Sequence, residues 1–338
     1  MSTNKLENLT WYVDTRAQQN GEPGIYHSYM ASLATTLNYI TDDFDPIWLM
    51  GSSAFAFRIF VNEVMCPSAM SIFHWAVILP EAIEQMGYHC IHISRLWHEE
   101  ELESSRRAEA QSEIMNAINN GIPAIVWDIA DVEWGLIIGY DDNNQFYHTL
   151  SHVGTSGTLP YIKLGKNGID ILSVAIPGVR NKRNKEEVIH KSLTAAIDHA
   201  AQKEWMDRPK YQDGLPAFDL WALLFDRWVM IEEAGRSKNL PEDIPNFASY
   251  YAGHHYSARC YARDYLRTIA NGNKNLQQAA QAYATVAACL KPIWECFPEQ
   301  KNPSAKLLSD FARNIRNAKK AEEEGIGFIK KYLNEKNE

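Results

Sequence analysis

The sequence contains little cysteine and no Cys-x-x-Cys pair. Its five cysteines among 338 residues are odd in number and widely spaced. An odd number without paired spacing argues against a disulfide framework and against a cysteine-rich zinc site. We therefore expect free thiols in a reducing cytoplasm, and neither a metal ion nor another cofactor.

Long apolar runs and an excess of basic residues are also absent. No segment approaches the roughly 18 apolar residues of a membrane span, and the first twenty residues lack the apolar core of a signal peptide. The 42 acidic and 33 basic residues give a formal net charge of −9, whereas nucleic-acid-binding proteins usually carry a basic face. We expect a cytoplasmic protein that binds neither a membrane nor nucleic acid.

Two parts of the chain have different hydrophobic patterns. Residues 1–178 mix helical spacing, as in the predicted helix over 28–39, with β-rich runs such as the predicted hairpin that turns at Asp141–Asn144. Residues 179–338 show helical spacing in five segments joined by short loops. We predict an α+β domain with a mostly antiparallel sheet over residues 1–178, followed by an all-α helical domain over 179–338.

Three stretches resemble motifs of a known family. HSYMASLATTLNYI, from His27, and MGSSAFAFRIFV, from Met50, resemble the first two motifs of the family named for the N-terminal domain of butirosin-biosynthesis protein H. This family is a C39-peptidase-like branch of the papain-like fold. GIPAIVWDIADVEWGLIIGYDD, from Gly121, is similar to the hairpin on which C39-like proteins carry their catalytic histidine.

The resemblance covers about residues 22–265 and implies both a fold and a chemistry. The implied fold of the N-terminal domain is papain-like, with a reactive residue at a helix N-terminus, where the helix dipole activates a nucleophile. The implied chemistry is acyl or aminoacyl transfer in secondary metabolism, with an acyl-carrier protein as one implied partner.

The catalytic positions of this family are altered in the chain. The family's nucleophilic cysteine follows a histidine, and here Ser28 follows His27. The family's histidine lies six positions before the glycine of the Gly-Tyr-Asp turn, where this chain has Glu133. The third catalytic residue would fall within 149–151, which holds no acid or amide, and Glu22 replaces the expected oxyanion-hole glutamine. A Cys–His mechanism is therefore not expected.

Three roles remain open for Ser28: a helix cap, which we favour, a nucleophile or a ligand contact. Serine is a preferred N-cap residue whatever its chemistry. A serine nucleophile needs a base, and a carboxylate is a weak one unless burial raises its pKa. Burial between Trp127, Trp134 and Tyr140 would provide such surroundings for Glu133. We favour a structural or ligand-facing Glu133, with catalysis by Ser28 and Glu133 as the alternative.

Further candidates come from histidines, from the Gly51-Ser52-Ser53 turn and from the polar-aromatic helical stripe that contains Tyr251 and His255. His27, His148 and His152 are candidates for a displaced catalytic imidazole. The Gly51-Ser52-Ser53 turn offers backbone N–H groups to an anionic or carbonyl-bearing ligand. The predicted ligand-binding residues are His27, Gly51, Ser52, Arg58, Trp134, His148, Tyr251 and His255.

We therefore predict a protein that binds a small acyl- or amide-bearing ligand between its two domains without Cys–His catalysis. One alternative is an acyltransferase or amide hydrolase with Ser28 as nucleophile. Another is a non-catalytic protein that binds a partner, which predicts no cavity around Ser28.

Overall fold

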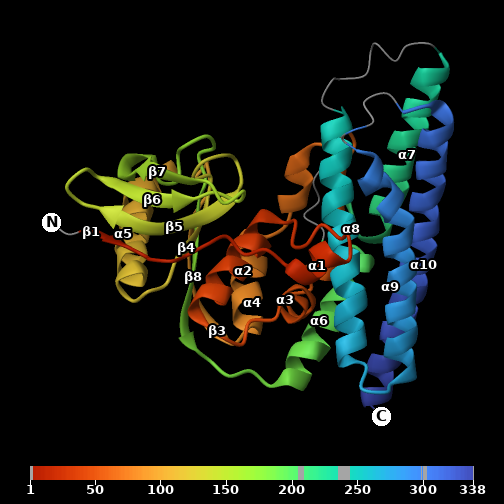
Figure 1. The fold of residues 1–338 in the computed structure, drawn as a ribbon, viewed down its shortest axis with the longest axis horizontal. Helices are drawn as coiled ribbons and strands as arrows, with labels where there is room; N and C mark the ends of the chain where they lie inside the picture. The colour runs from red at the N-terminus through yellow and green to blue at the C-terminus, as the bar shows by residue number, and fades with distance from the viewer. Residues whose placement is uncertain (1–2, 205–208, 235–243, 298, 300–302, 338) are drawn as a thin grey trace. The chain divides into compact units, whose positions relative to one another are not determined.

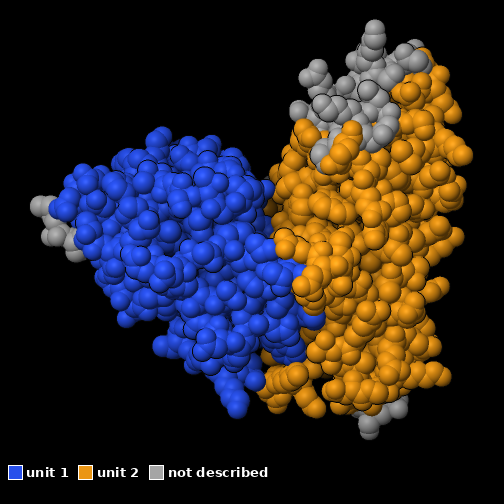
Figure 2. All heavy atoms as spheres, in the orientation of Figure 1, with its two compact units in different colours: residues 1–15, 27–49, 75–183 blue, residues 16–26, 50–74, 184–338 orange. Residues whose placement is uncertain are grey.

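The chain divides into two compact units (Figure 2). The computed structural model describes residues 3–204, 209–234, 244–297, 299 and 303–337. Unit 1 comprises Met1–Thr15, His27–Leu49 and Trp75–Arg183, and unit 2 comprises Arg16–Tyr26, Met50–His74 and Asn184–Glu338. The sequence predicts consecutive domains that meet at residue 178, whereas two early segments of the chain, 16–26 and 50–74, belong to the helical unit.

Unit 1 contains the predicted antiparallel sheet. Its central order is β3 (Tyr88–Arg95), β8 (Leu172–Arg180), β4 (Ala124–Trp127), β5 (Trp134–Asp141), β6 (Phe146–Leu150) and β7 (Ser156–Pro160), and β1 (Thr3–Lys5) also pairs with β5. Every strand pair in this seven-stranded sheet is antiparallel. The predicted hairpin is confirmed as β5 and β6, whose turn is closed by the Asp141 carboxylate on two backbone N–H groups.

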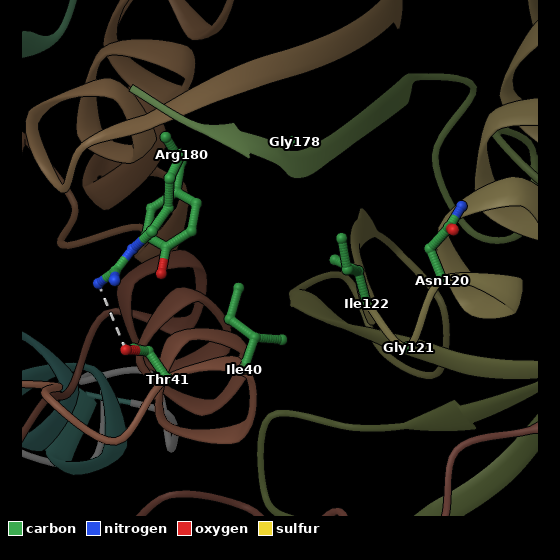
Figure 3. Close-up of a pocket in the computed structure, with 8 residues that line it drawn as sticks. Ile40, Thr41, Asn120, Gly121, Ile122, Gly178 and Arg180 are labelled. Atoms are coloured by element: carbon green, nitrogen blue, oxygen red, sulfur yellow. Dashed lines mark hydrogen bonds between the residues drawn. The ribbon is translucent and has the colours of Figure 1, made fainter. Parts of the chain in front are cut away.

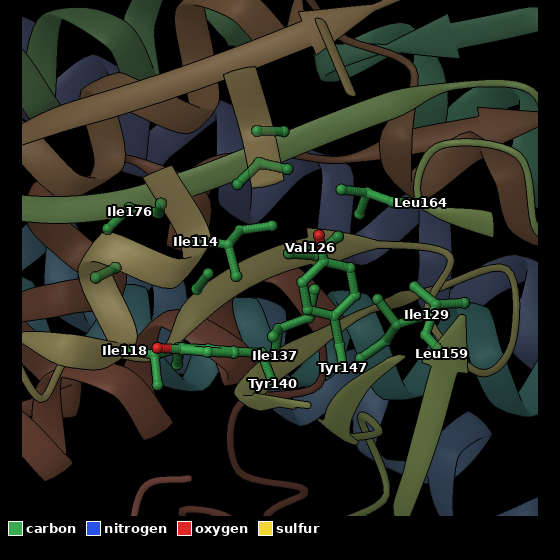
Figure 4. Close-up of a cluster of buried hydrophobic side chains, with 14 of the residues drawn as sticks. Ile114, Ile118, Val126, Ile129, Ile137, Tyr140, Tyr147, Leu159, Leu164 and Ile176 are labelled. Carbon is green, nitrogen blue, oxygen red and sulfur yellow. The ribbon is translucent and has the colours of Figure 1, made fainter. Parts of the chain in front are cut away.

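Helices pack on the sheet of unit 1 (Figure 1). α2 (Ser28–Ile40) packs against β4 and β5, and α4 (Trp75–Gln85) packs against β3 and β8. Alternate residues of a strand point to opposite faces. On one face, Val126 packs with Ile114 of α5 (Glu103–Asn119) in the core cluster of Figure 4, and Val174 belongs to the same cluster. Unit 1 also contains two short 3-10 helices, η3 (Glu100–Leu102) and η4 (Tyr161–Lys163). In two further helices, α1 (Thr15–Gln19) and α3 (Pro46–Ser52), the chain passes from unit 1 to unit 2.

Unit 2 contains the five predicted C-terminal helices. They are α6 (Lys185–Ala200), α7 (Gly214–Glu233), α8 (Ile244–Ile269), α9 (Lys274–Cys296) and α10 (Ala305–Asn337). The prediction of an all-α domain is wrong in one detail, because β9 (Tyr211–Asp213) pairs with β2 (Phe60–Asn62). The sequence pattern missed β9 because three residues are too few to show a period. η1 (Phe55–Phe57) and η2 (Pro67–Ser71) flank β2.

Among the described residues, no helix combines the length and the apolar composition that a bilayer crossing requires.

Candidate functional site

Ser28 is the first residue of α2 rather than its cap. His27 occupies the N-cap position with extended backbone angles, and no side chain makes a capping hydrogen bond there. The interpretation of Ser28 as the N-cap is therefore wrong. The first turn of a helix has backbone N–H groups without helical partners.

The Ser28 hydroxyl is hydrogen-bonded to Glu133. Ser28 Oγ donates to Glu133 Oε2 at 2.5 Å and accepts the backbone N–H of Trp134 at 3.3 Å. Ser28 is only 5% exposed, while Glu133 is half-buried. The two residues singled out as a substitute catalytic pair are thus in direct contact, although their role stays a prediction.

Three carboxylates of the loop between β4 and β5 bind three different parts of unit 1. Glu133 binds Ser28, and Asp131 Oδ2 lies 3.1 Å from His152 Nδ1. The buried Asp128 accepts the backbone N–H groups of residues 168 and 169 at 2.6 and 2.7 Å. This loop therefore fixes the start of α2, the turn after β6 and the segment before β8.

Three indole rings pack together beside the Ser28–Glu133 pair. The ring centroids of Trp127 and Trp134 are 4.3 Å apart, and the ring of Trp75 lies 5.0 and 4.5 Å from them. His27 also lies near Trp134, at 6.1 Å between ring centroids. Trp127 and Trp134 are buried and Trp75 is half-buried. The cluster places apolar, polarisable side chains next to the Ser28–Glu133 pair.

His148 does not belong to this group. It pairs with Gly139 on β5, five residues beyond Trp134, which corresponds to about 16 Å along a strand. Its ring packs edge-on against Phe146, and burial, aided by the Lys5 charge, lowers the pKa of His148. Tyr140 likewise lies further along β5, where its hydroxyl donates to Asn119.

Five predicted ligand-binding residues lie in unit 2, where their side chains or backbone have intramolecular partners. Arg58 donates to Glu204 at 2.8 and 3.1 Å, and the Tyr251 hydroxyl donates to the Cys66 carbonyl at 2.8 Å. His255 Nε2 lies 3.2 Å from the Phe60 carbonyl oxygen.

The other two of these five, Gly51 and Ser52, are buried in packing. The Tyr265 ring lies so close to Gly51 that an added Cβ would come 2.0 Å from Tyr265 Cγ. Ser52 ends α3 and is 2% exposed. Contacts within the protein are therefore sufficient to explain why these five residues of unit 2 are buried. A ligand-binding role for them stays a prediction.

A pocket of about 340 Å³ lies at the opposite end of α2 (Figure 3). Its lining includes Ile40 and Thr41, which end α2, as well as Tyr88 and Arg180. Ile40 is twelve residues from Ser28, or about 18 Å along the helix. Arg180 already binds Asp43 at 3.0 Å and Thr41 at 3.4 Å, so this pocket is separate from the Ser28–Glu133 site.

Two residues of the site escaped the sequence analysis. Trp75 begins α4, and no short-range pattern connects it to Ser28, 47 positions earlier. Asp131 was overlooked beside Glu133, although two carboxylates with one residue between them on a turn are a recognisable signal for polar contacts. His152 is one of the candidate imidazoles, and its ring lies against Asp131 rather than Ser28.

Among the described residues, no group of three or more potential metal ligands converges. Comparison with protein-family models gives no match, and comparison with curated proteins gives none either.

Proposed function

We propose that unit 1 is a papain-like domain that binds a small acyl- or amide-bearing ligand beside Ser28 and Glu133 without Cys–His catalysis. The observation that carries this proposal is the 2.5 Å hydrogen bond from Ser28 Oγ to Glu133 Oε2. Among the described residues, no imidazole nitrogen makes a hydrogen bond with Ser28 Oγ. An ordinary serine nucleophile relies on such a base.

The surroundings of the pair suit binding. A carboxylate offers about four acceptor positions, so Glu133 can accept from a ligand as well as from Ser28. The start of α2 lacks a side-chain cap, and helix N-termini bind carbonyl oxygens and anions. The indoles of Trp75, Trp127 and Trp134 provide apolar surface for the rest of the ligand.

The test is a titration of the full chain with benzamide and with the benzoyl thioester of N-acetylcysteamine. Benzamide is an amide probe, and the thioester, whose N-acetyl group is itself an amide, resembles an acyl group on a carrier arm. We expect both to bind, with no product detectable by mass spectrometry. Glu133→Gln should weaken binding about tenfold or more, because hydrogen bonds to a charged group contribute about 1.5–3 kcal/mol.

Glu113→Gln provides the matched control, since it makes the same change on α5. Binding of neither probe, or equal loss of binding in both variants, would refute the proposal.

A second function is favoured by the same short hydrogen bond. Ser28 could attack an acyl carbonyl while its proton passes to Glu133; the leaving group would depart with a proton, and water would then release the acyl group. A helix N-terminus stabilises the oxyanion of such a step. If Ser28 is such a nucleophile, we expect turnover of the thioester and a covalent adduct of Ser28 with a fluorophosphonate. Both should disappear in Ser28→Ala, and turnover that survives this change excludes the mechanism.

The remaining parts of the proposal rest on other grounds. The resemblance supports a role in secondary metabolism and an acyl-carrier protein as partner. The five cysteines are all free thiols, which supports a reducing, cytoplasmic location.

A further inference from the structure

The indole N–H of Trp127 is a buried donor without an acceptor. Trp127 is 7% exposed, and among the described residues no hydrogen-bond acceptor lies within reach of its Nε1. A buried polar group without a partner costs free energy, and a bound molecule that accepts its hydrogen bond would remove this cost.

This donor belongs to the same corner of unit 1 as the Ser28–Glu133 pair. Trp127 is the last residue of β4 and pairs in register with Trp134, the first residue of β5. The backbone N–H of Trp134 binds Ser28 Oγ, and the side chain of Trp134 packs on Trp127 with 4.3 Å between ring centroids. Trp134 therefore connects the two groups: its strand partner is Trp127, and its backbone N–H binds the Ser28 hydroxyl.

We propose that Trp127 Nε1–H donates to the carbonyl oxygen of the ligand, while the Glu133 carboxylate accepts the ligand's N–H. The ligand is then an uncharged primary or secondary amide with a flat apolar group that packs against the indole rings. This inference rests on the proposed function, because it identifies the class of ligand that binds beside Ser28 and Glu133.

The arrangement discriminates among related compounds. An ester has the carbonyl oxygen but no N–H for Glu133, and an amine has the N–H but no carbonyl for Trp127. A carboxylate anion would be repelled by Glu133 and Asp131, two acidic groups of one short loop. Sites with polar groups placed for one hydrogen-bonding pattern reject ligands that lack it.

The experiment follows the indole N–H resonances of the full chain by ¹H–¹⁵N NMR during titration. The probes are benzamide, methyl benzoate, benzoate and benzylamine, which share one aromatic ring. The Trp127 peak is identified by its absence from Trp127→Phe or, if this variant does not fold, by its nuclear Overhauser effects to the Trp134 ring. We expect benzamide to shift the Trp127 peak downfield and to bind more tightly than the other three probes.

Trp221→Phe is the matched control. Trp221 lies on α7 in unit 2, is fully buried, and also has an Nε1 without an acceptor among the described residues. We expect Trp127→Phe to weaken benzamide binding about fivefold, which is the loss of one neutral hydrogen bond, and Trp221→Phe to leave it unchanged.

Two outcomes distinguish a failure of this inference from a failure of the proposed function. If benzamide binds in a Glu133-dependent way but the Trp127 peak does not move, or methyl benzoate binds equally well, the amide inference is wrong and the proposed function stands. If neither benzamide nor the acyl thioester binds, the proposed function itself fails and this inference fails with it.

Discussion

Two buried polar groups, one in each unit, differ in their partners. In unit 2, the Arg259 guanidinium is fully buried and has four acceptors: both oxygens of Glu322 and the carbonyls of Phe57 and Arg58. In unit 1, the indole N–H of Trp127 is also buried but has no acceptor among the described residues.

The starts of helices also differ, although not by unit: α7 in unit 2 begins without a side-chain cap. The Asn184 and Asn273 side chains cap α6 and α9 by accepting backbone N–H groups, at 2.9 and 3.1 Å. α2 begins at Ser28 with no side-chain cap. Where polar groups satisfy one another, they hold the fold together. Four predictions test whether this contrast is energetic as well as geometric.

The largest effect is expected in unit 2 from Glu322→Ala. This change leaves the Arg259 guanidinium, which is fully buried, without its charged partner. Loss of one partner from a buried ion pair costs about 3–5 kcal/mol. Urea unfolding followed by far-ultraviolet circular dichroism measures the loss. The double variant Arg259→Met/Glu322→Leu should be less destabilised than Glu322→Ala, and a loss below about 1 kcal/mol for Glu322→Ala would show that the pair is not structural.

The second effect concerns pH and a histidine in unit 1. Burial lowers the pKa of His92 to about 4, below the usual value of about 6.5 in an unfolded chain. As pH falls, the unfolded state therefore takes up a proton first. The contribution of neutral His92 to the free energy of unfolding is fully present above about pH 6.5. It decreases by about 3 kcal/mol as the pH falls to about 4 and below.

Urea unfolding at several pH values between 7 and 4 measures this loss. His92→Gln should lose less stability over this range than the parent chain. His89→Gln changes an exposed histidine of the same strand and should behave like the parent. Parallel pH profiles for all three chains would contradict the assignment to His92.

The third effect compares two glycines. An alanine at Gly51 would place its Cβ against the Tyr265 ring, whereas a Cβ at Gly327 of α10 meets nothing within 4 Å. Gly51→Ala should destabilise the chain by about 1–3 kcal/mol through overpacking. Gly327→Ala should stabilise it by about 0.5–1 kcal/mol through helix propensity. If the thermal unfolding midpoints of both variants rise, segment 50–74 adjusts its backbone at position 51 to accommodate the added methyl group.

The smallest effect concerns the cap of α6. Asn184→Ala removes the side-chain acceptor of the Glu186 N–H and should cost about 1 kcal/mol. Asn184→Ser keeps a capping oxygen and should cost much less. The difference between their unfolding midpoints in urea isolates the cap, and equal midpoints would show that water replaces it without loss.

Local patterns predicted the helices well and the division into units poorly. The five C-terminal helices were predictable because each repeats apolar residues over many turns. Segment 50–74 was not assignable, because its apolar run does not specify which unit it packs in. Its contacts with α8, such as Asn62 with Tyr251, join residues 189 positions apart.

The candidate site was predictable only in part. The resemblance placed Ser28 and Glu133 together across 105 positions, and the hydrogen bond between them shows that they are in contact. Asp131 and Trp75 could not be placed by spacing, since their positions depend on how β4, β5 and α4 meet. The helix-cap interpretation of Ser28 failed because a one-residue shift of a helix start is beyond the accuracy of local patterns.

The packing of segments 16–26 and 50–74 against α8 also affects when these segments can fold during synthesis. All of unit 1 has left the ribosome's catalytic centre once residue 183 is made. Arg259, however, binds the Phe57 carbonyl 202 positions earlier, and Ser257 binds the Gly24 carbonyl 233 positions earlier. At about 5–20 residues per second, these 202 residues take roughly 10–40 s to synthesise. For that interval the apolar stretch around Phe57 lacks its partner helix, so the nascent chain should depend on a chaperone most strongly before α8 emerges.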